Sequence, residues 1–559
     1  MVSPELRPEF DQGTIDEIVR RVLSVTQPDR IILFGSAATG RMTRDSDIDL
    51  LIVGEIRKYR DANRISCPSF VDRGNTGSVP GFPRRMIMRR RDFLKCVGAG
   101  AAAMVVPGSL GRMTAQAEEG SAAKPNFIVI LIDDMGYGDI EPYGSKLNRT
   151  PNLSRMAAEG MKLTSFYAAP VCTPSRAQLL TGCYAKRVSM PNVLNPSSPT
   201  GLSTAEKTVA RLLKERGYAT MCVGKWHLGD QPEFLPTKHG FDHYVGLPHA
   251  TGTSSKNSSS LLLRDEKVVE AAAELDKLTR LFTEEAVKFI TANKDKPFFL
   301  YLPHTAVHLP ISPGKDFAGK SANGRYGDWI EEVDWSVGRV LDTLRDLKLD
   351  SDTMVLFTSD NGPGGGRDGG VAGPLRGGKG SCWEGGVREP TIAWWPGKIA
   401  AGSSCDAMMG EIDVLPTLVK LAGGEMAAGK KIDGMDVWPL WSGKGKESPH
   451  EALYYFNVTS RLEGVRSGQW KLLISRPRDI LGTNTIADAK GPFSPELYNL
   501  DNDIGEKLDV ADRNPDVVKR LRELIDKMDK DLGINQNGPG VRPCGRVAQP
   551  KPLFMDARE

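Results

Sequence analysis

The chain has 559 residues, of which 40% are hydrophobic and 26% are charged, a composition typical of a globular protein of two or three domains. The formal net charge of +3 gives no support for a nucleic-acid partner. The eight cysteines show no CxxC pair or zinc-site spacing, and no apolar run is long enough to form a stable membrane span.

The N-terminal part, residues 1–56, contains two apolar runs with polar groups beside them. The first run, 31–34, leads into a Gly-Ser pair, and the second carries Asp47 and Asp49 on one face of a predicted strand. This pattern resembles the core of the minimal nucleotidyltransferases, in which such groups hold a metal-bound nucleotide. We find no third carboxylate of that family, so we interpret the segment as a truncated module. Residues 57–85, polar and without periodicity, are predicted to be an unstructured linker.

A signal-peptide pattern follows at residues 86–117. Three arginines precede a short apolar core, Cys96–Val106, and a small-residue sequence, Ala115–Ala117. The paired arginines followed by Asp-Phe-Leu-Lys resemble a twin-arginine signal, which implies the twin-arginine export machinery as a partner. We therefore predict a periplasmic or extracellular protein whose translation starts at Met86 or Met88.

Residues 124–441 have the pattern of one large α/β domain. Continuous apolar runs predict buried parallel strands at Phe127–Ile132, Tyr218–Val223, Phe298–Leu302 and Met354–Phe357. Helical patterns lie between them, at 208–216, 275–293 and 329–347. This alternation predicts a large mixed, mostly parallel sheet flanked by helices, and such sheets bind ligands at the carboxyl ends of their strands.

Each of these four runs ends in polar residues, which the sheet would bring to one edge. They are Asp133 and Asp134, Lys225 and His227, His304 and His308, and Asp360 and Asn361. Asp133, Asp134, Asp360 and Asn361 offer only oxygen ligands, which favour a hard cation over zinc. These residues therefore predict a site for one hard cation, calcium or magnesium.

The segment Cys-Thr-Pro-Ser-Arg at 172–176 predicts the start of a helix with Cys172 at its N-terminus, where negative charge is favoured. Arg176 lies four residues on, on the same helix face. One interpretation is a thiolate nucleophile, although the cysteine phosphatases place their arginine six residues after the cysteine. Another is an ordinary buried cysteine. The segment, with the Leu-Leu-Thr-Gly that follows, also resembles the sulfatase signature, in which the cysteine is oxidised to formylglycine.

The resemblance to the arylsulfatase A-like branch of the sulfatases runs from about residue 124 to 510. That branch binds calcium through a D-D and a D-N-G motif, which match Asp133, Asp134, Asp360 and Asn361 here. The resemblance therefore implies one bound Ca²⁺ ion, with Mg²⁺ less favoured. It implies an alkaline-phosphatase-like fold. It also implies a sulfated small molecule or glycan as the substrate, and a maturation enzyme that generates formylglycine from Cys172.

Three further motifs of the branch carry its substrate-binding residues. G-K-W-H-L-G matches 224–229 and assigns Lys225 and His227 to the substrate. T-A-P-H-x-P matches 305–310, with valine in place of the proline, and selects His308. G-K-G-x-x-x-E-G-G-V-R-E-P matches 378–390 and selects Lys379.

The resemblance also implies a mechanism. Calcium, Arg176, Lys225 and Lys379 would bind the sulfate group. A hydroxyl of the hydrated formylglycine would attack sulfur, and His308 would protonate the leaving alcohol as a general acid. His227 would take the proton of the second hydroxyl, so that the aldehyde forms again and sulfate leaves.

The C-terminal part is predicted to form a small α+β subdomain, residues 450–532, followed by a tail at 533–559. Short alternating runs at 453–456, 464–467, 470–474 and 496–500 predict an antiparallel sheet, and 516–532 predicts a helix. We expect His450 to be a surface residue, and Arg388 and Glu389 to pair with each other.

Three alternatives to a sulfatase stay open from the residues. The first is a phosphomonoester or phosphonate ester hydrolase of the same fold. The second is a nucleotidyltransferase that depends on Asp47 and Asp49. The third is a sulfated-glycan binder whose cysteine is never oxidised. The three histidines of the 237–249 segment, His239, His243 and His249, could also line a substrate pocket.

Overall fold

The structure is a computed structural model that describes residues 124–249, 260–364, 369–426, 429–477, 493–551 and 553, with the backbone of three short strands near the N-terminus. The chain divides into two compact units, Met1–Ala117 and Glu118–Glu559.

The first unit contains an antiparallel sheet of β1 (Arg30–Phe34), β2 (Ile48–Val53) and β3 (Arg85–Met88), in that order. The two strands expected from the apolar runs are therefore present. β3 begins at the last residue of the predicted linker and covers the start of the predicted signal peptide. Asp47 and the rest of that signal, 89–117, lie outside the described residues.

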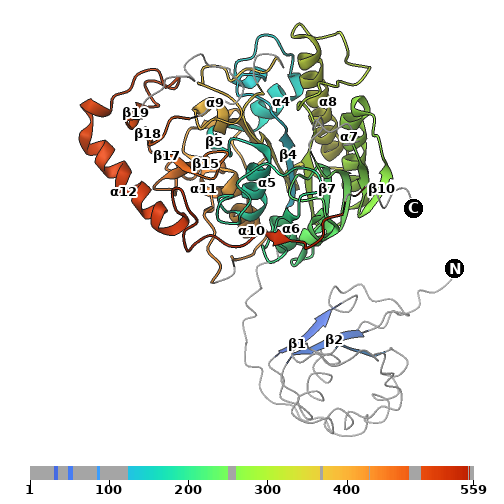
Figure 1. Cartoon of the computed structure of the whole chain (residues 1–559). Helices are drawn as coiled ribbons and strands as arrows, with labels where there is room; N and C mark the ends of the chain where they lie inside the picture. The colour runs from blue at the N-terminus through green and yellow to red at the C-terminus, as the bar shows by residue number, and fades with distance from the viewer. Residues whose placement is uncertain are drawn as a thin grey trace, which may run out of the picture. The chain divides into compact units, whose positions relative to one another are not determined.

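The second unit is built on an eleven-stranded sheet of described residues (Figure 1). Its strands are β4 (Asn126–Ile132), β5 (Met161–Tyr167), β7 (Ala219–Lys225), β8 (His243–Leu247), β9 (Leu262–Arg264), β10 (Lys267–Glu270), β11 (Phe298–Pro303), β12 (Thr353–Ser359), β13 (Arg388–Trp394), β14 (Ser403–Cys405) and β15 (Met409–Gly410). Their order is β10-β9-β8-β7-β11-β4-β12-β13-β5-β14, and β15 also pairs with β5. The predicted mixed, mostly parallel sheet is confirmed, and β8-β7-β11-β4-β12 form its parallel centre.

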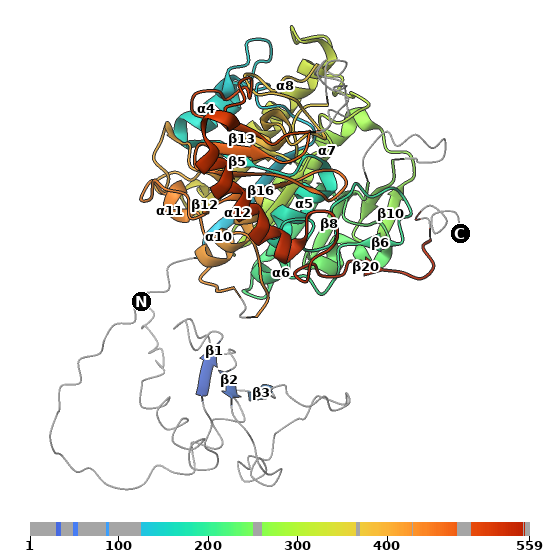
Figure 2. The same ribbon diagram turned by 60° about the vertical axis from the view of Figure 1, so that its left-hand side comes forward.

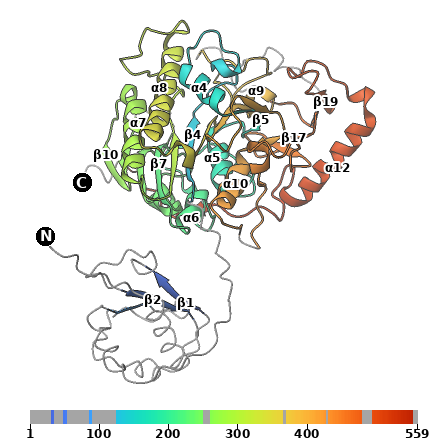
Figure 3. The ribbon, with the colours of Figure 1, turned by 180° about the vertical axis from the view of Figure 1, so that it is seen from behind.

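Helices cover both faces of this sheet, which explains the continuous apolar strands. On β4, Ile128, Ile130 and Ile132 pack in one core with α4 (Pro151–Glu159), α7 (Leu275–Ala292) and α8 (Gly324–Asp346). Phe127, Val129 and Leu131 point the other way, into a core with α5 (Cys172–Thr181), α6 (Val209–Lys214) and α10 (Val414–Leu421). Figure 3 shows the unit from behind. A strand buried on both faces needs apolar residues at every position.

The C-terminal subdomain is a four-stranded antiparallel sheet with one long helix. β16 (Leu453–Phe456), β17 (Leu462–Ser467), β18 (Trp470–Leu473) and β19 (Glu496–Asn499) pair in sequence order. The helix α12 (Pro515–Leu532) lies beside these strands (Figures 1 and 2). Its buried residues Leu521, Leu524 and Ile525 belong to one core with residues of the sheet. The predicted strands and helix are therefore confirmed. No helix among the described residues is long and apolar enough to cross a membrane.

Candidate active site

The predicted polar residues meet at the carboxyl ends of the central parallel strands. Asp133 and Asp134 follow β4, Asp360 follows β12, and Lys225 is the last residue of β7. β4 lies between β11 and β12, and β7 pairs with β11 on its other side. Short contacts between residues distant in the sequence follow from this arrangement: the backbone N–H of Asp134 donates to Oδ1 of Asp360 at 3.2 Å.

Cys172 begins α5 and points at the two aspartates. Its Sγ atom lies 3.2 Å from Oδ1 of Asp133 and 3.9 Å from Oδ1 of Asp134. Burial, together with the charges of Asp133 and Asp360, raises the pKa of the Cys172 thiol well above its usual range. An unmodified cysteine is therefore protonated here, which argues against the thiolate interpretation.

Three cations surround the three carboxylates. Arg176 donates to Oδ2 of Asp360 through Nε (3.0 Å) and Nη2 (2.8 Å), and Lys225 Nζ lies 2.5 Å from Oδ2 of Asp133. Lys379 Nζ lies 2.6 Å from both carboxylate oxygens of Asp134. The formal charges cancel. A bound divalent cation would therefore make the site positive, which suits an anionic substrate.

Two histidines also lie at this edge of the sheet, and one ring nitrogen of each forms a hydrogen bond with a backbone carbonyl oxygen. His227 Nε2 lies 3.0 Å from the carbonyl oxygen of Leu194, and His308 Nδ1 lies 2.8 Å from that of Leu309. A carbonyl only accepts, so these nitrogens carry the protons. In the neutral rings, His227 Nδ1 and His308 Nε2 are then the free acceptors. His308 Nε2 lies 3.8 Å from Oδ2 of Asp134.

The other histidine of the β11 loop has a different position. His304 is fully buried beside Phe282 of α7, and its Nε2 bonds Ser336 Oγ at 3.1 Å. Burial lowers the pKa of His304 to about 3. Its contacts are those of a core residue, whereas His308 faces the carboxylates.

The donor set fits a hard cation. Among the described residues, Oδ1 of Asn361 is buried and has no hydrogen-bond partner, while its Nδ2 donates to Oδ1 of Asp134 at 2.8 Å. A bare amide oxygen beside carboxylates is a ligand that calcium prefers. One ligand atom each of Asp133, Asp134, Cys172 and His308 lie within 4.8 Å of one another. Asp360 is outside this group.

Two site residues have left-handed backbone conformations, with φ of 63° at Asp134 and 60° at His227. Such angles are strained for residues other than glycine and are often found at functional sites. In both cases the residue lies just beyond the end of a central strand, where the chain turns to present its side chain to the site.

Several other predicted residues have structural contacts. His239 is fully buried beside Trp226, and His243 is exposed at 62%. His249 Nε2 lies 2.7 Å from Oδ2 of Asp230, a partner that no local motif indicates.

Two predictions were wrong. His450 is 7% exposed, because its Nε2 pairs with Oδ1 of Asp413 at 2.7 Å. Arg388 pairs instead with Glu384 at 3.2 Å. The two residues are four positions apart across the short helix α9 (Glu384–Val387), which brings their side chains to the same side. Glu389 points elsewhere, and its two oxygens have no hydrogen-bond partner among the described residues.

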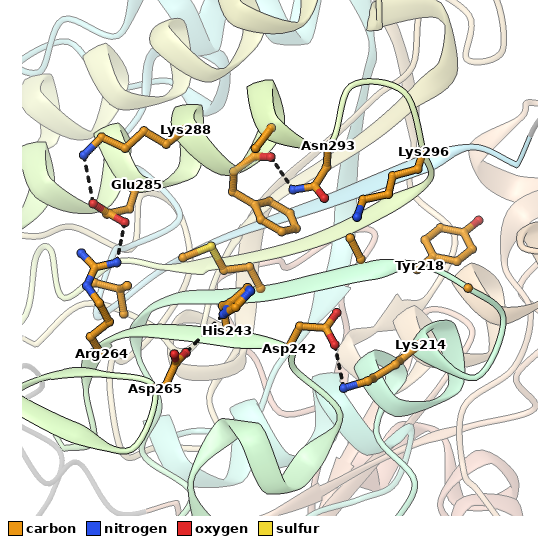
Figure 4. Close-up of a pocket in the computed structure, with 16 residues that line it drawn as sticks. Lys214, Tyr218, Asp242, His243, Arg264, Asp265, Glu285, Lys288, Asn293 and Lys296 are labelled. Carbon is orange, nitrogen blue, oxygen red and sulfur yellow. Dashed lines mark hydrogen bonds and ion pairs between the residues drawn. The ribbon is translucent and has the colours of Figure 1, made fainter. Parts of the chain in front are cut away.

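A pocket of about 960 Å³ lies at the opposite end of β7, beside Ala219 and Met221 (Figure 4). Several of its polar side chains pair with one another: Lys214 with Asp242 at 2.6 Å, Arg264 and Lys288 with Glu285 at 3.1 Å, and His243 with Asp265 at 3.5 Å. Two carboxylates of the pocket, Asp242 and Glu285, are thus already paired with cations. The cluster of polar residues around Cys172 is therefore the better candidate for the active site.

Comparisons with known proteins agree with this geometry. The family model described as Sulfatase matches residues 125–424, and that described as N-sulphoglucosamine sulphohydrolase, C-terminal, matches 378–531. A Nucleotidyltransferase domain model matches 15–92, a longer segment than the predicted 1–56.

Individual proteins match along most of their length. N-acetylgalactosamine-6-sulfatase of Mus musculus is 35% identical, over 79% of this chain and 92% of that protein. Arylsulfatase A of Homo sapiens is 38% identical, over 72% of this chain and 87% of that protein. A solved structure from work on the metabolism of glycosaminoglycans by Bacteroides thetaiotaomicron has a TM-score of 0.67 and 29% identity, over 73% of this chain and 100% of that one.

Proposed function

Because this chain belongs to the sulfatase family and is a sulfuric ester hydrolase, we propose that it acts through a formylglycine made from Cys172, beside a bound calcium ion. The observation that carries this proposal is the position of Cys172. Cys172 is the first residue of the buried helix α5, and its Sγ atom contacts the carboxylates of Asp133 and Asp134. The same site also contains three cationic side chains and two histidines. Among the cysteines of the described residues, Cys172 is the one that lies at this edge of the sheet.

We assign sulfate binding to Arg176, Lys225 and Lys379. Arg176 and Lys225 are fully buried, and Lys379 is 17% exposed. All three lie beside carboxylates at this edge, and positive charge there would stabilise the charge that develops on the sulfate oxygens. Arg176 is held rigidly, since its Nη1 also donates to the carbonyl oxygen of Lys225 at 2.6 Å. A fixed donor costs little reorganisation during the reaction.

The two histidines are assigned to proton transfer. Burial, with the charges of Lys225 and Arg176, lowers the pKa of His227 well below its usual range, so its free Nδ1 can accept a proton from the group at position 172. His308 presents Nε2 to the site, and in the protonated ring, where Nε2 also carries a proton, it is assigned as the general acid for the leaving oxygen.

Calcium would be held by Asp133, Asp134, Asp360 and Asn361. A cation there would neutralise a sulfate oxygen and favour the nucleophilic form of the formylglycine hydrate. Burial opposes ionisation of Asp134, but Lys379 and His308 outweigh it and lower its pKa, so the carboxylate is ready to bind a cation.

We also propose a sulfated carbohydrate as the substrate. The relative from Mus musculus is named for N-acetylgalactosamine 6-sulfate, and the matching bacterial structure comes from work on glycosaminoglycans. Release of sulfate from a panel of sulfated monosaccharides, with a steryl sulfate and an aryl sulfate for comparison, tests this class.

The domain boundaries and the export route are proposed as well. We propose a catalytic domain at 124–441, a C-terminal subdomain at 450–532, and twin-arginine export to the periplasm with cleavage after Ala117. Fusing residues 86–117 to a fluorescent reporter that folds in the cytoplasm tests export: fluorescence in the periplasm is expected, and its loss on replacing Arg90 and Arg91 by lysine is the control.

The nucleophile is tested by mass spectrometry of the tryptic peptide 163–176, from protein made in a host that matures sulfatases. The expected mass shows that sulfur is lost and an aldehyde oxygen gained at Cys172. The matched control is Cys172→Ala, whose methyl side chain cannot be converted to the aldehyde in the same way. An intact thiol at position 172, in a host that matures a known sulfatase, would contradict the proposal.

A further inference from the structure

The loop that carries Lys379 is attached to the C-terminal subdomain by a buried lysine. Lys471 lies on β18 and its side chain is 0% exposed. Its Nζ atom donates to the carbonyl oxygen of Cys382 at 2.8 Å and to Oε1 of Glu384 at 2.9 Å, and lies 2.8 Å from Oε1 of Glu506. Both hydrogen-bond acceptors, Cys382 and Glu384, belong to the segment that follows Lys379, and Glu506 adds an ion pair.

The two glutamates extend this connection into the large sheet. Oε2 of Glu384 accepts from the hydroxyl of Tyr167 on β5 at 2.6 Å and from Arg388 on β13 at 3.2 Å. Oε2 of Glu506 accepts from the backbone N–H of Glu384 at 2.7 Å. Burial opposes ionisation of Glu384, but Lys471 and Arg388 lower its pKa to about 2. The start of α9 is therefore held from both subdomains.

The other end of the same loop is bonded to the catalytic domain through its backbone. The N–H of Lys379 donates to the carbonyl oxygen of Pro363 at 3.0 Å, and that of Gly380 donates to Pro170 at 2.7 Å. Cys382, which Lys471 holds, is only three residues after Lys379. A displacement at Cys382 cannot be absorbed over so short a distance without moving Lys379.

We propose that Lys471 is a positioning residue, which fixes the loop from the C-terminal subdomain so that the ammonium group of Lys379 reaches the sulfate site. The inference rests on the proposed role of Lys379 in binding sulfate. Removing the charge of Lys471 would leave Glu384 and Glu506 buried without their common cation, and the loop would rearrange to hydrate them. Sulfate binding would weaken although no group that touches substrate has changed.

A matched control exists at the same subdomain boundary. Lys186 is 2% exposed, and its Nζ donates to the carbonyl oxygens of Ser460 (3.0 Å) and Gly533 (2.7 Å) of the C-terminal part. Within the described part of the chain, its ammonium group forms no hydrogen bond with the loop of Lys379. Lys186→Met therefore removes a buried lysine between the same two subdomains without disturbing that loop.

The experiment is a double-mutant cycle between Lys471→Met and Lys379→Ala, in the full chain. Two quantities are measured for each variant: kcat/KM for 4-nitrophenyl sulfate, and the Kd of inorganic sulfate. In the wild-type background, we expect Lys471→Met to lower kcat/KM about 10-fold or more, mainly by raising KM. We also expect it to raise the Kd of inorganic sulfate. In the Lys379→Ala background the same change should cost less than about 3-fold, because the group it positions is gone.

Equal losses in both backgrounds, or an equal loss in Lys186→Met, would overturn the inference in favour of a general structural role. If Lys471→Met does not fold, as judged by its thermal unfolding, Glu506→Gln takes its place. It keeps the shape of the network and should show a smaller loss that again vanishes in Lys379→Ala. Absence of sulfate release from both aryl and sugar sulfates by the mature wild-type protein would count against the proposed function, whereas the sulfate Kd cycle would still decide the role of Lys471.

Discussion

The Nε2 atom of His227 lies 3.0 Å from the carbonyl oxygen of Leu194, and this contact determines the proton position on the ring. Because Nε2 must donate, the buried Nδ1 atom is a bare acceptor with no hydrogen-bond partner among the described residues. The lowered pKa of His227 keeps the ring neutral at pH 7. A buried neutral imidazole with a free Nδ1 is a base that needs no rearrangement to accept a proton.

We predict that His227→Ala lowers kcat about 10²–10³-fold, since a positioned base contributes about that much to turnover. His243→Ala, at an exposed histidine on β8, serves as the control and should stay within about 2-fold. Steady-state kinetics with 4-nitrophenyl sulfate gives both values. A loss below about 3-fold in His227→Ala would show that the ring is not the base.

The proposed role of His308 as a general acid predicts a dependence on the leaving group. His308→Ala should lower kcat/KM about 10²-fold or more for a sugar sulfate, whose alkoxide must be protonated as it leaves. The loss should be at most about 10-fold for 4-nitrophenyl sulfate, because that phenolate is stable without a proton. His304→Gln offers the comparison within the same loop. Equal losses on both substrates would contradict the assignment.

The bare oxygen of Asn361 predicts a measurable role in cation binding. Removing divalent cations with a chelator should lower the thermal unfolding temperature, and calcium should restore it with a saturating dependence on concentration. Asn361→Leu, which deletes the oxygen donor at nearly equal volume, should raise the calcium Kd in this titration about 10-fold or more. Asn293→Leu, at the C-terminus of α7, is the control. An unfolding temperature that changes neither with the chelator nor with added calcium would exclude the cation site.

The buried ring of His239 predicts a loss of stability in acid. Burial lowers its pKa to about 3, whereas the unfolded chain binds the proton near pH 6.5. A depressed folded pKa contributes stability above the unfolded pKa, and that contribution is lost as pH falls from about 6.5 toward 3. Between pH 6.5 and 5 the loss is about 2 kcal/mol.

Urea unfolding of the wild type and of His239→Leu at pH 7 and pH 5 measures this difference. The apolar variant should lose about 2 kcal/mol less between the two pH values than the wild type. His243→Leu removes an exposed histidine and should leave the wild-type pH dependence unchanged. Identical pH dependence in His239→Leu and the wild type would mean that the ring is already protonated or hydrated when folded.

The separate N-terminal unit predicts that residues 1–85 are dispensable for sulfate ester hydrolysis. The site residues all lie in the unit Glu118–Glu559, so a chain that begins at Met86 should keep kcat/KM within about 2-fold. Asp49→Ala in the full chain is the corresponding point variant and should leave hydrolysis unchanged. Loss of hydrolysis in both variants would support the nucleotidyltransferase interpretation of the main activity.

Much of the site could be predicted because its residues directly follow local patterns. Asp133, Lys225 and Asp360 stand at the ends of apolar runs, and parallel strands necessarily bring their carboxyl ends to one edge. The strands and the helix of the C-terminal subdomain could be predicted for the same reason, since periodicity over a few residues reports which side of an element is buried.

Contacts between distant segments could not be predicted in this way. Glu384 follows no pattern that points to Lys471, 87 residues later, or to Glu506, 122 residues later. The sequence predicts a surface position for His450, whereas the fold brings it to Asp413.

The sequence by itself therefore determined the elements, the strand-end residues and the helix that begins at Cys172. Only the tertiary structure decided which side chains those residues meet, which histidines are buried, and how the C-terminal subdomain holds the loop of Lys379. The physical reason is that periodicity is local, whereas pairing of buried charges depends on the packing of whole elements.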